Sequence, residues 1–529
     1  MMDIRFNKKG SALILALLVT ASAVILSAAI LSKSVSEANF ARRNLLSEKA
    51  FYLSEAGIEK TAYTLAYNTA NHLSPPVSGT ITDFLSSGFT LNYTCVDLDS
   101  SDSSLTDSTG VSYFIRHYQI TASVVDPNSG VEIVLNQVVV RKKTYAFQHA
   151  VFYADDLEIL PGPNMTLSGR IHSNHDIYLG ANKTLTIDTD YMYSAGNIYN
   201  RRKNDGSRSG GDIKIRVKDS SPPSYDYMEK SGDYLDSDNP DWTDESQTRW
   251  AGTVKSSVHG VKSLAVPVVG SVQPDGYYAQ NSGLKIIKKT GGEWQLSSEG
   301  KPLLLSDLPE GTITEKTFKD NRENTVVTVT DIDVSKLNSS GYFPSNGLIY
   351  ASREDASPSS PNGVRLVNGS ELNSGLTLVS NDPVYIKGDY NTVDKKPAAV
   401  ICDAVNILSN NWDDAKDMFS QRYASDTEVN SAFISGIVPT PDGGGNYSGG
   451  LENYPRLNEK WSGKDLKIRG SFVELWLSQI AKGEWRYGSP VYEAPYRDWD
   501  YDIDFNDSSK LPPFTPFAVE IEGVAWWKS

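Results

Sequence analysis

The stretch from Ser11 to Ser32 limits the possible folds more than any other part of this chain. Its 22 residues contain no charged residue, no glycine and no proline. As a helix they would span ~33 Å, which is enough to cross the hydrocarbon core of a bilayer. A cleaved secretory signal has a shorter apolar core of ~7 to 15 residues, then a polar break and a small-residue cleavage site. Because no break precedes the small residues at 27–29, we expect a helix that is retained rather than discarded.

The helical pattern continues beyond the apolar stretch. Residues 33–70 contain one glycine, Gly57, and the first proline is Pro75. A stripe of small and apolar residues recurs here at spacings of three, four or seven, formed by Ala38, Ala41, Leu45, Tyr52, Ala56 and Tyr63. We predict one rod over residues 11–70, apolar at first and then amphipathic, whose stripe packs on a following sheet.

The N-terminal residues resemble those of a known family. "KKG" followed by "SALILALL", and later "EKAFYLSEAGIEKTAYTLA", is similar to the N-terminus of minor type IV pilins of the PilX type and of the related pseudopilins of type II secretion. The resemblance covers about the first 67 residues. It implies a leader over residues 1–10, whose basic residues Arg5, Lys8 and Lys9 stay in the cytoplasm. It also implies cleavage by prepilin peptidase between Gly10 and Ser11 and methylation of the new N-terminus.

The resemblance implies the partners and the location as well. They are the inner membrane, prepilin peptidase and other pilins, with a single-pass helix, an extracytoplasmic C-terminal part and cell-surface display after assembly. Membrane insertion and subunit packing would involve Leu15, Leu18, Val24 and Ile30, followed by Ala38, Leu45, Tyr52 and Ala56. Major pilins usually carry Phe and Glu at mature positions one and five, where this chain has Ser11 and Leu15. Without that Glu, the chain resembles a minor component at the filament tip or in priming.

The rest of the chain is typical of β structure. After a linker at Pro75, the segments 89–98, 113–125 and 131–147 are rich in β-branched residues, and Asp126 to Gly130 is a hairpin turn. We therefore predict a mainly β protein with a long N-terminal helix, in which a small antiparallel head (71–148) precedes a large β-solenoid-like domain (149–529). Short apolar doublets between turn residues favour the solenoid, which has an irregular insertion at about 220–345. "SNHDIYLG" from Ser173 and "SNDPVYIKG" from Ser380 form a weak internal repeat.

Two polar clusters are candidate metal sites. His172, His175 and Asp176 combine ligand types suited to zinc or iron, and Asp500, Asp502 and Asp504 are spaced as in calcium loops. In solenoid turns such residues more often hydrogen-bond the backbone, and on a strand alternate Asp residues form a solvated face. We favour these structural interpretations and predict no metal and no cofactor.

The function classes narrow accordingly. A net charge of -15 argues against a general nucleic-acid surface. Cys95 and Cys402 permit one disulfide without implying it. We predict a non-enzymatic pilin-like subunit. The alternatives are an anchored adhesin with a surface or glycan ligand and a carbohydrate-active enzyme, in which Trp461, Trp476 and Trp485 would stack on sugars.

Overall fold

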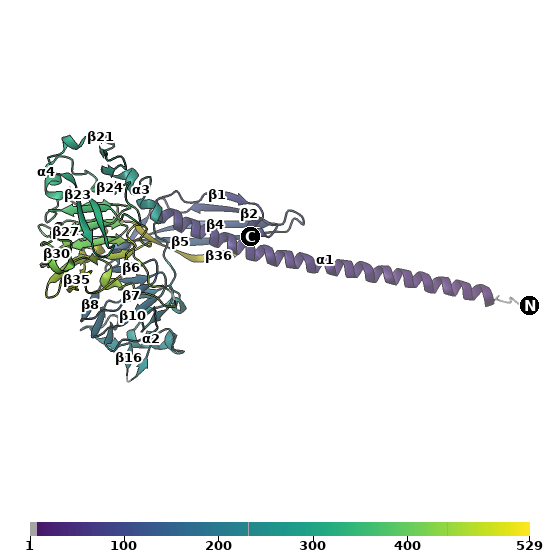
Figure 1. Cartoon of the computed structure of the whole chain (residues 1–529). Coiled ribbons are helices and arrows are strands. Elements are labelled where there is room, and N and C mark those ends of the chain that lie inside the picture. The colour runs from purple at the N-terminus through teal and green to yellow at the C-terminus, as the bar shows by residue number, and fades with distance from the viewer. Residues whose placement is uncertain (1–7, 231, 442) are drawn as a thin grey trace, which may run out of the picture.

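The N-terminal rod is a single helix that projects from a large β region. The computed structural model describes residues 8–230, 232–441 and 443–529, and helix α1 runs over Lys8–Ala70. Its N-terminal half contacts nothing else in the described chain, whereas its C-terminal half lies along the head sheet (Figure 1). The helix is continuous because only Gly10 and Gly57 interrupt good helix formers, and no proline occurs within it.

The head is an antiparallel sheet with the strand order β1-β2-β4-β5-β36. Strand β3 pairs with the first residues of β4, Ser112 to Ile115. The predicted hairpin is confirmed, because β4 and β5 pair over their length and Asp126 accepts hydrogen bonds from Asn128 and Ser129 in the turn. The strands are β1 (Ser78–Ile81), β2 (Thr90–Asp97), β3 (Ser103–Thr106), β4 (Ser112–Val125), β5 (Glu132–Tyr145) and β36 (Phe517–Lys528).

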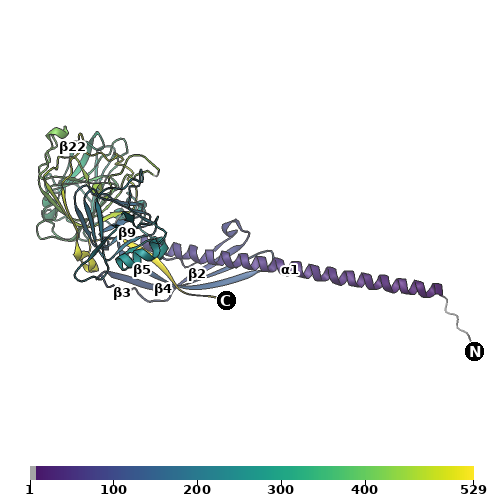
Figure 2. The same ribbon diagram turned by 90° about the horizontal axis from the view of Figure 1, so that it is seen from below.

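The C-terminal strand changes the predicted domain boundary. We expected residues 149–529 to form the ectodomain, but β36 returns and pairs antiparallel with β5, from Phe517 opposite Tyr145 to Lys528 opposite Leu135. Figure 2 shows the C-terminus lying next to the strands of the head. The solenoid-like domain is therefore inserted between two adjacent strands of the head sheet.

The first part of the solenoid-like domain consists of three stacked rungs of three strands each. Every strand pairs in parallel with its counterpart in the next rung, so that Val151 lies opposite Ile171, and Ile171 opposite Met192. The rungs are β6 (Val151–Tyr153), β7 (Leu157–Ile159) and β8 (Met165–Ser168); β9 (Ile171–Ser173), β10 (Ile177–Leu179) and β11 (Thr184–Asp188); and β12 (Met192–Ser194), β13 (Ile198–Tyr199) and β14 (Asp212–Arg216). The apolar doublets seen in the sequence are the inward side chains of these rungs.

The second part repeats this parallel stacking. Its strands are β24 (Leu348–Arg353), β25 (Gly363–Val367), β26 (Leu376–Val379), β27 (Val384–Lys387), β28 (Ala398–Cys402), β29 (Val405–Leu408), β30 (Thr427–Asn430), β31 (Ala432–Ser435), β32 (Arg456–Leu457), β33 (Asp465–Gly470), β34 (Phe472–Glu474) and β35 (Tyr496–Tyr501). Strand β34 pairs in parallel with β6, which joins the two parts along one continuous sheet. We call this junction the seam.

The segment predicted as an irregular insertion is more regular than expected. It contributes β18 (Val254–Lys255), β19 (Leu284–Lys288) and β23 (Thr325–Asp333), which extend the solenoid sheets by pairing with β12, β24 and β25. Its other elements are β15 (Tyr225–Tyr227), β16 (Glu229–Lys230), β17 (Asp233–Tyr234), β20 (Trp294–Ser298), β21 (Lys301–Leu303), β22 (Ile313–Asp320), α2 (Trp242–Trp250), α3 (Tyr277–Asn281) and α4 (Val334–Ser339). Because this segment is rich in proline and serine, its strands were not recognised in the sequence.

The two copies of the internal repeat lie at equivalent corners of the solenoid-like domain. Ser173 ends a strand of the long continuous sheet and Ser380 directly follows another, and in each case the serine hydroxyl oxygen accepts the backbone N–H two residues later, at 3.1 Å. Both serines are fully buried. The repeat therefore reflects a shared need to satisfy the backbone at a sharp turn between two sheets.

Candidate functional site

The first candidate site is the exposed part of α1. The helix is long and apolar enough to cross a membrane by length and composition, with a mean hydropathy of 2.6 in its most apolar window and none of that window buried. Leu15, Leu18, Val24 and Ile30 all expose more than half of their surface, for example 68% for Val24. Apolar exposure on this scale indicates a surface made to be covered by lipid or by other chains.

The predicted processing residues lie at the start of this helix. Gly10 is exposed, and a Cβ atom added to it would meet nothing within 4 Å among the described residues, so packing with them does not require a glycine here. Ser11 follows in the same exposed turn. Arg5 lies outside the described residues, and Lys8 and Lys9 form the first turn of α1. The role of these residues in processing stays a prediction.

Apart from Ala56, the predicted stripe does not pack on the head sheet, so that prediction is wrong. Leu45 and Tyr52 are 67% and 61% exposed, Ala38 is exposed, and Ala56 is half-buried. The face that packs on β2, β4 and β5 is the opposite one, formed by Ala50, Leu53, Ser54, Gly57, Ile58, Thr61, Ala62 and Leu65. Both faces have small or apolar residues at helical spacing, and the sheet selects the face whose small residues allow a close approach.

The second candidate site is a cavity of about 340 Å³ beside the seam. It lies at corners contributed by several rungs of both solenoid parts, and we call it the seam cavity. Its charged and polar lining includes Asp155, Asp156, Glu158, Lys203, Arg322, Thr440, Ser448, Asn453 and Arg456. The lining therefore combines acidic, basic and neutral hydrogen-bonding groups.

Glu158 has an unsatisfied oxygen in this cavity. Its Oε1 accepts hydrogen bonds from the hydroxyl groups of Thr440 and Ser448, whereas Oε2 is buried and has no partner among the described residues. Only 5% of the residue is exposed. Burial raises the pKa of Glu158, although the two hydroxyl groups oppose the shift. A buried oxygen without a partner costs stability, so the site gains from a ligand that supplies a donor.

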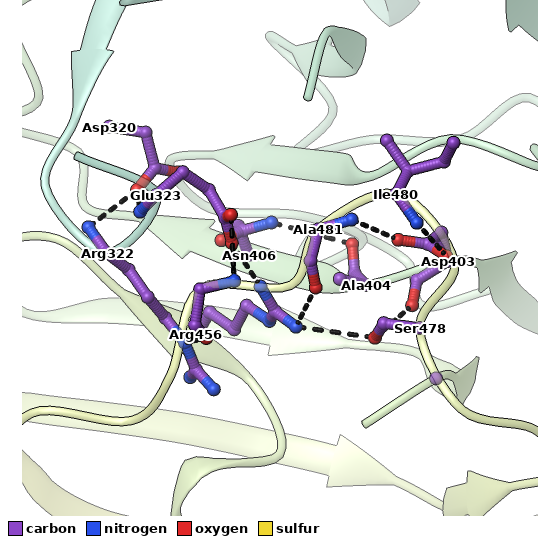
Figure 3. A network of polar contacts seen from close by, with 12 residues as sticks. Asp320, Arg322, Glu323, Asp403, Ala404, Asn406, Arg456, Ser478, Ile480 and Ala481 are labelled. Atoms are coloured by element: carbon purple, nitrogen blue, oxygen red, sulfur yellow. Dashed lines mark hydrogen bonds and ion pairs between the residues drawn. The ribbon is translucent and has the colours of Figure 1, made fainter. Parts of the chain in front are cut away.

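Arg322 supplies the free positive charge of the cavity. Its Nε donates to the carbonyl oxygen of Gly483 at 2.9 Å, and among the described residues no carboxylate lies within ion-pair distance of it. In Figure 3 its terminal nitrogens extend away from the other labelled groups. Burial, together with the adjacent Arg456, lowers the pKa of Arg322 to about 9.

Arg456 is held differently from Arg322. Its guanidinium group pairs with Glu323 at 2.6 Å and donates to the carbonyl oxygen of Ala481 at 2.7 Å (Figure 3). Asp403 accepts the backbone N–H groups of Ile480 and Ala481 at 3.0 and 2.7 Å. This network anchors the loop around residues 478–483 on the solenoid-like domain, directly after Leu477 of the cavity lining.

The histidine-rich metal candidate, His172, His175 and Asp176, does not form a metal site among the described residues. His172 is buried, stacks on Phe152, and lies 3.3 Å from the Tyr191 hydroxyl and 3.2 Å from the Asn174 side chain. His175 is exposed. Burial lowers the pKa of His172 to about 3, so the ring is neutral. Asp176 accepts the backbone N–H of Asn197 at 2.6 Å, just as Asp156 accepts that of Asp176 one rung earlier.

The acidic metal candidate, Asp500, Asp502 and Asp504, forms ion pairs with lysine and arginine side chains. Asp500 lies 3.7 Å from Arg469, and Lys395 pairs with Asp502 and Asp504 at 2.7 and 3.2 Å. Strand β35 ends at Tyr501, so Asp502 and Asp504 lie beyond it and the predicted solvated strand face does not extend to them. Within residues 8–230, 232–441 and 443–529, no group of three or more His, Cys, Asp or Glu side chains is arranged to hold a metal ion.

Apart from His175, which lies in the lining, sequence reasoning did not find the cavity residues. Asp155, Glu158, Arg322 and Arg456 are scattered over 300 positions, and no local motif connects them. Of the tryptophans considered for sugar stacking, Trp461 and Trp476 are buried, and Trp485 is half-buried. Cys95 and Cys402 are both free and buried in different cores.

The comparisons with known proteins are sparse. No protein-family model and no curated protein matches the chain. Among solved structures, the competence-associated pilin ComZ from Thermus thermophilus is 10% identical, with 91% of this chain and 97% of that chain covered and a TM-score of 0.28. A superposition with so low a score supports no conclusion about fold or function.

Proposed function

We propose that this chain is a pilin-like minor subunit of a type IV pilus or of a type II secretion pseudopilus. The observation that carries the proposal is the two-part helix α1, whose apolar N-terminal half is fully exposed and whose C-terminal half packs on an antiparallel sheet. Such a helix serves first as a membrane anchor and then as the joint between subunits.

The exposed stripe of α1 supports the same proposal. Leu45, Tyr52 and Tyr63 lie on the face directed away from the head, where packing within the chain leaves them in solvent. In a filament this face would meet neighbouring helices. The large inserted domain would crowd a close-packed shaft, so a position at the tip or in priming suits the chain better.

The proposal is tested by the mature N-terminus. In cells that contain prepilin peptidase, we expect the chain purified from the inner-membrane or pilus fraction to begin at Ser11. Gly10→Leu should leave the full-length chain in the membrane with a folded β region, since the Gly10 site has no packing neighbours. Ala16→Leu is the matched control and should be processed normally. Normal processing of the Gly10→Leu chain, or a mature chain beginning after Ala29, would contradict the proposal.

A further inference from the structure

The seam cavity has the features of a ligand site rather than of a packing defect. At about 340 Å³ it falls within the usual range of ~300 to 1,000 Å³ for small-molecule sites. It also contains the buried Oε2 of Glu158, which has no hydrogen-bond partner among the described residues, and the guanidinium group of Arg322, which pairs with no carboxylate among them. Packing defects are apolar, whereas this cavity has charged groups.

The free guanidinium group requires an anion. Arg456 is neutralised by Glu323, and Lys203 pairs with Asp156 at 2.6 Å, but Arg322 has no carboxylate within ion-pair distance among the described residues. A guanidinium group binds carboxylates through two parallel hydrogen bonds. The ligand should therefore carry a carboxylate or a comparable planar anion.

The acidic groups of the lining argue against a ligand that is an anion without hydrogen-bond donors. Asp155 makes no side-chain hydrogen bond or ion pair with the described residues, and Glu158 has an oxygen without a partner. These oxygens repel a bare anion and accept hydrogen bonds, so the rest of the ligand must bring donors. Glu158 already accepts from two neutral hydroxyl groups, and Thr440, Ser448 and Asn453 also suit neutral partners.

We propose that the seam cavity binds an acidic saccharide unit, with its carboxylate on Arg322 and its hydroxyl groups on Glu158 and Asp155. A sugar acid combines an anion and several neutral donors in a unit of the right size. The inference goes beyond the proposed pilin-like role, because it concerns the solenoid-like domain and does not depend on processing or assembly.

The test is calorimetric titration of the full chain, solubilised in a detergent without a sugar headgroup. The probes are D-glucuronate, D-galacturonate and their neutral amides. We expect at least one acid to bind with a Kd of about 1 mM or tighter, and its amide at least tenfold more weakly. Arg322→Gln should weaken binding of that acid at least tenfold, and Asp155→Asn should weaken it too.

The matched control is Arg486→Gln, which removes an exposed arginine from the neighbouring loop without touching the lining. It should bind as the unmodified chain does. Thermal unfolding of each variant shows whether Arg322→Gln still folds, and Arg322→Lys provides a milder change that keeps the charge. The proposal is overturned if neither acid binds, if the amides bind equally well, or if free aspartate or glycine binds more tightly than the acids.

Failure of this test and failure of the proposed function are distinguishable. A chain that is cleaved after Gly10 but binds no sugar acid would overturn the saccharide site alone. A chain that binds the acid but is never processed would overturn the pilin-like role alone.

Discussion

At the scale of single residues, the polar groups of the solenoid-like domain hold loops in place. Asp176 and Asp156 each accept a backbone N–H from the following rung, and Ser173 and Ser380 do the same within their own corners. The strongest example is the Arg456–Glu323 pair, in which the side chains are 3% and 7% exposed. A buried pair of this kind is costly to break, because removing one partner leaves an uncompensated charge.

This pair leads to a prediction about stability. Arg456→Met should lower the free energy of unfolding of the solenoid-like domain by about 3 to 5 kcal/mol, since Glu323 loses its counterion. The double variant Arg456→Met with Glu323→Met should recover part of that loss. Urea unfolding followed by tryptophan fluorescence measures both.

The matched control for that prediction is an exposed pair. Lys289 and Glu354 lie 2.6 Å apart with side chains 31% and 39% exposed, so Lys289→Met should cost no more than about 1 kcal/mol. Equal losses in the two single variants would show that the buried network does not stabilise the domain in the way described here.

At the scale of elements, the contact between α1 and the head sheet depends on small side chains. Gly57 lies where a Cβ atom would come within 2.6 Å of the Leu91 side chain and 3.3 Å of Ala122. Ser54 and Thr61 lie on the same face, one helical turn before and after Gly57. Their side chains are small, and their hydroxyl groups donate to carbonyl oxygens of the same helix. The helix therefore approaches the sheet closely at this point.

Enlarging Gly57 should loosen the helix from the sheet. We expect Gly57→Leu to lower the free energy of unfolding of the head by about 1 to 3 kcal/mol through overpacking. Ala41→Leu places the same side chain on the exposed part of α1 and should change the free energy of unfolding by no more than about 0.5 kcal/mol. Hydrogen exchange of the β2 and β4 backbone amides reports the difference, and unchanged protection in Gly57→Leu would contradict the packing described.

At the scale of the whole molecule, two parts far apart in the sequence meet at the seam. Glu474 on β34 accepts the backbone N–H groups of Ala154 and Asp155 at 3.0 and 3.1 Å, while its other oxygen is buried without a partner among the described residues. Burial, and secondarily the charge of Asp155, raises the pKa of Glu474 to about 8. Glu452, nearby, has a pKa raised to about 7 by burial.

These shifts predict how the stability of the seam depends on pH. In the unfolded chain Glu474 loses its proton near its ordinary pKa of 4.5, whereas the folded chain keeps it up to about pH 8. The folded state then holds more protons, so stability falls as pH rises from about 4.5 to 8. Glu474→Gln should remove this contribution, and its melting temperature relative to the unmodified chain should rise with pH over that window.

The control for the pH prediction is Glu371→Gln, which changes an exposed glutamate of the same domain. Its melting temperature should follow that of the unmodified chain at every pH. His149 and His172 act in the opposite direction, because burial lowers their pKa values to about 4 and 3 and stability is lost as pH falls below 6.5. Parallel pH curves for Glu474→Gln and the unmodified chain would contradict the assignment.

Much of the architecture follows from local patterns. The uncharged length of Ser11–Ser32 predicts the exposed apolar helix, the turn residues Asp126–Gly130 predict the β4–β5 hairpin, and the short apolar doublets predict stacked rungs. These features were predictable because each depends on residues that are close to one another in the sequence.

The tertiary structure alone decided the rest. It placed Phe517–Lys528 in the head sheet, joined β34 to β6, and turned the Leu45 and Tyr52 face of α1 away from the head. It also gathered Glu158, Arg322 and Arg456 around one cavity. None of these features has a local signature, because strand partners and cavity walls are chosen by which distant surfaces fit together, and spacing along the chain carries no record of that choice.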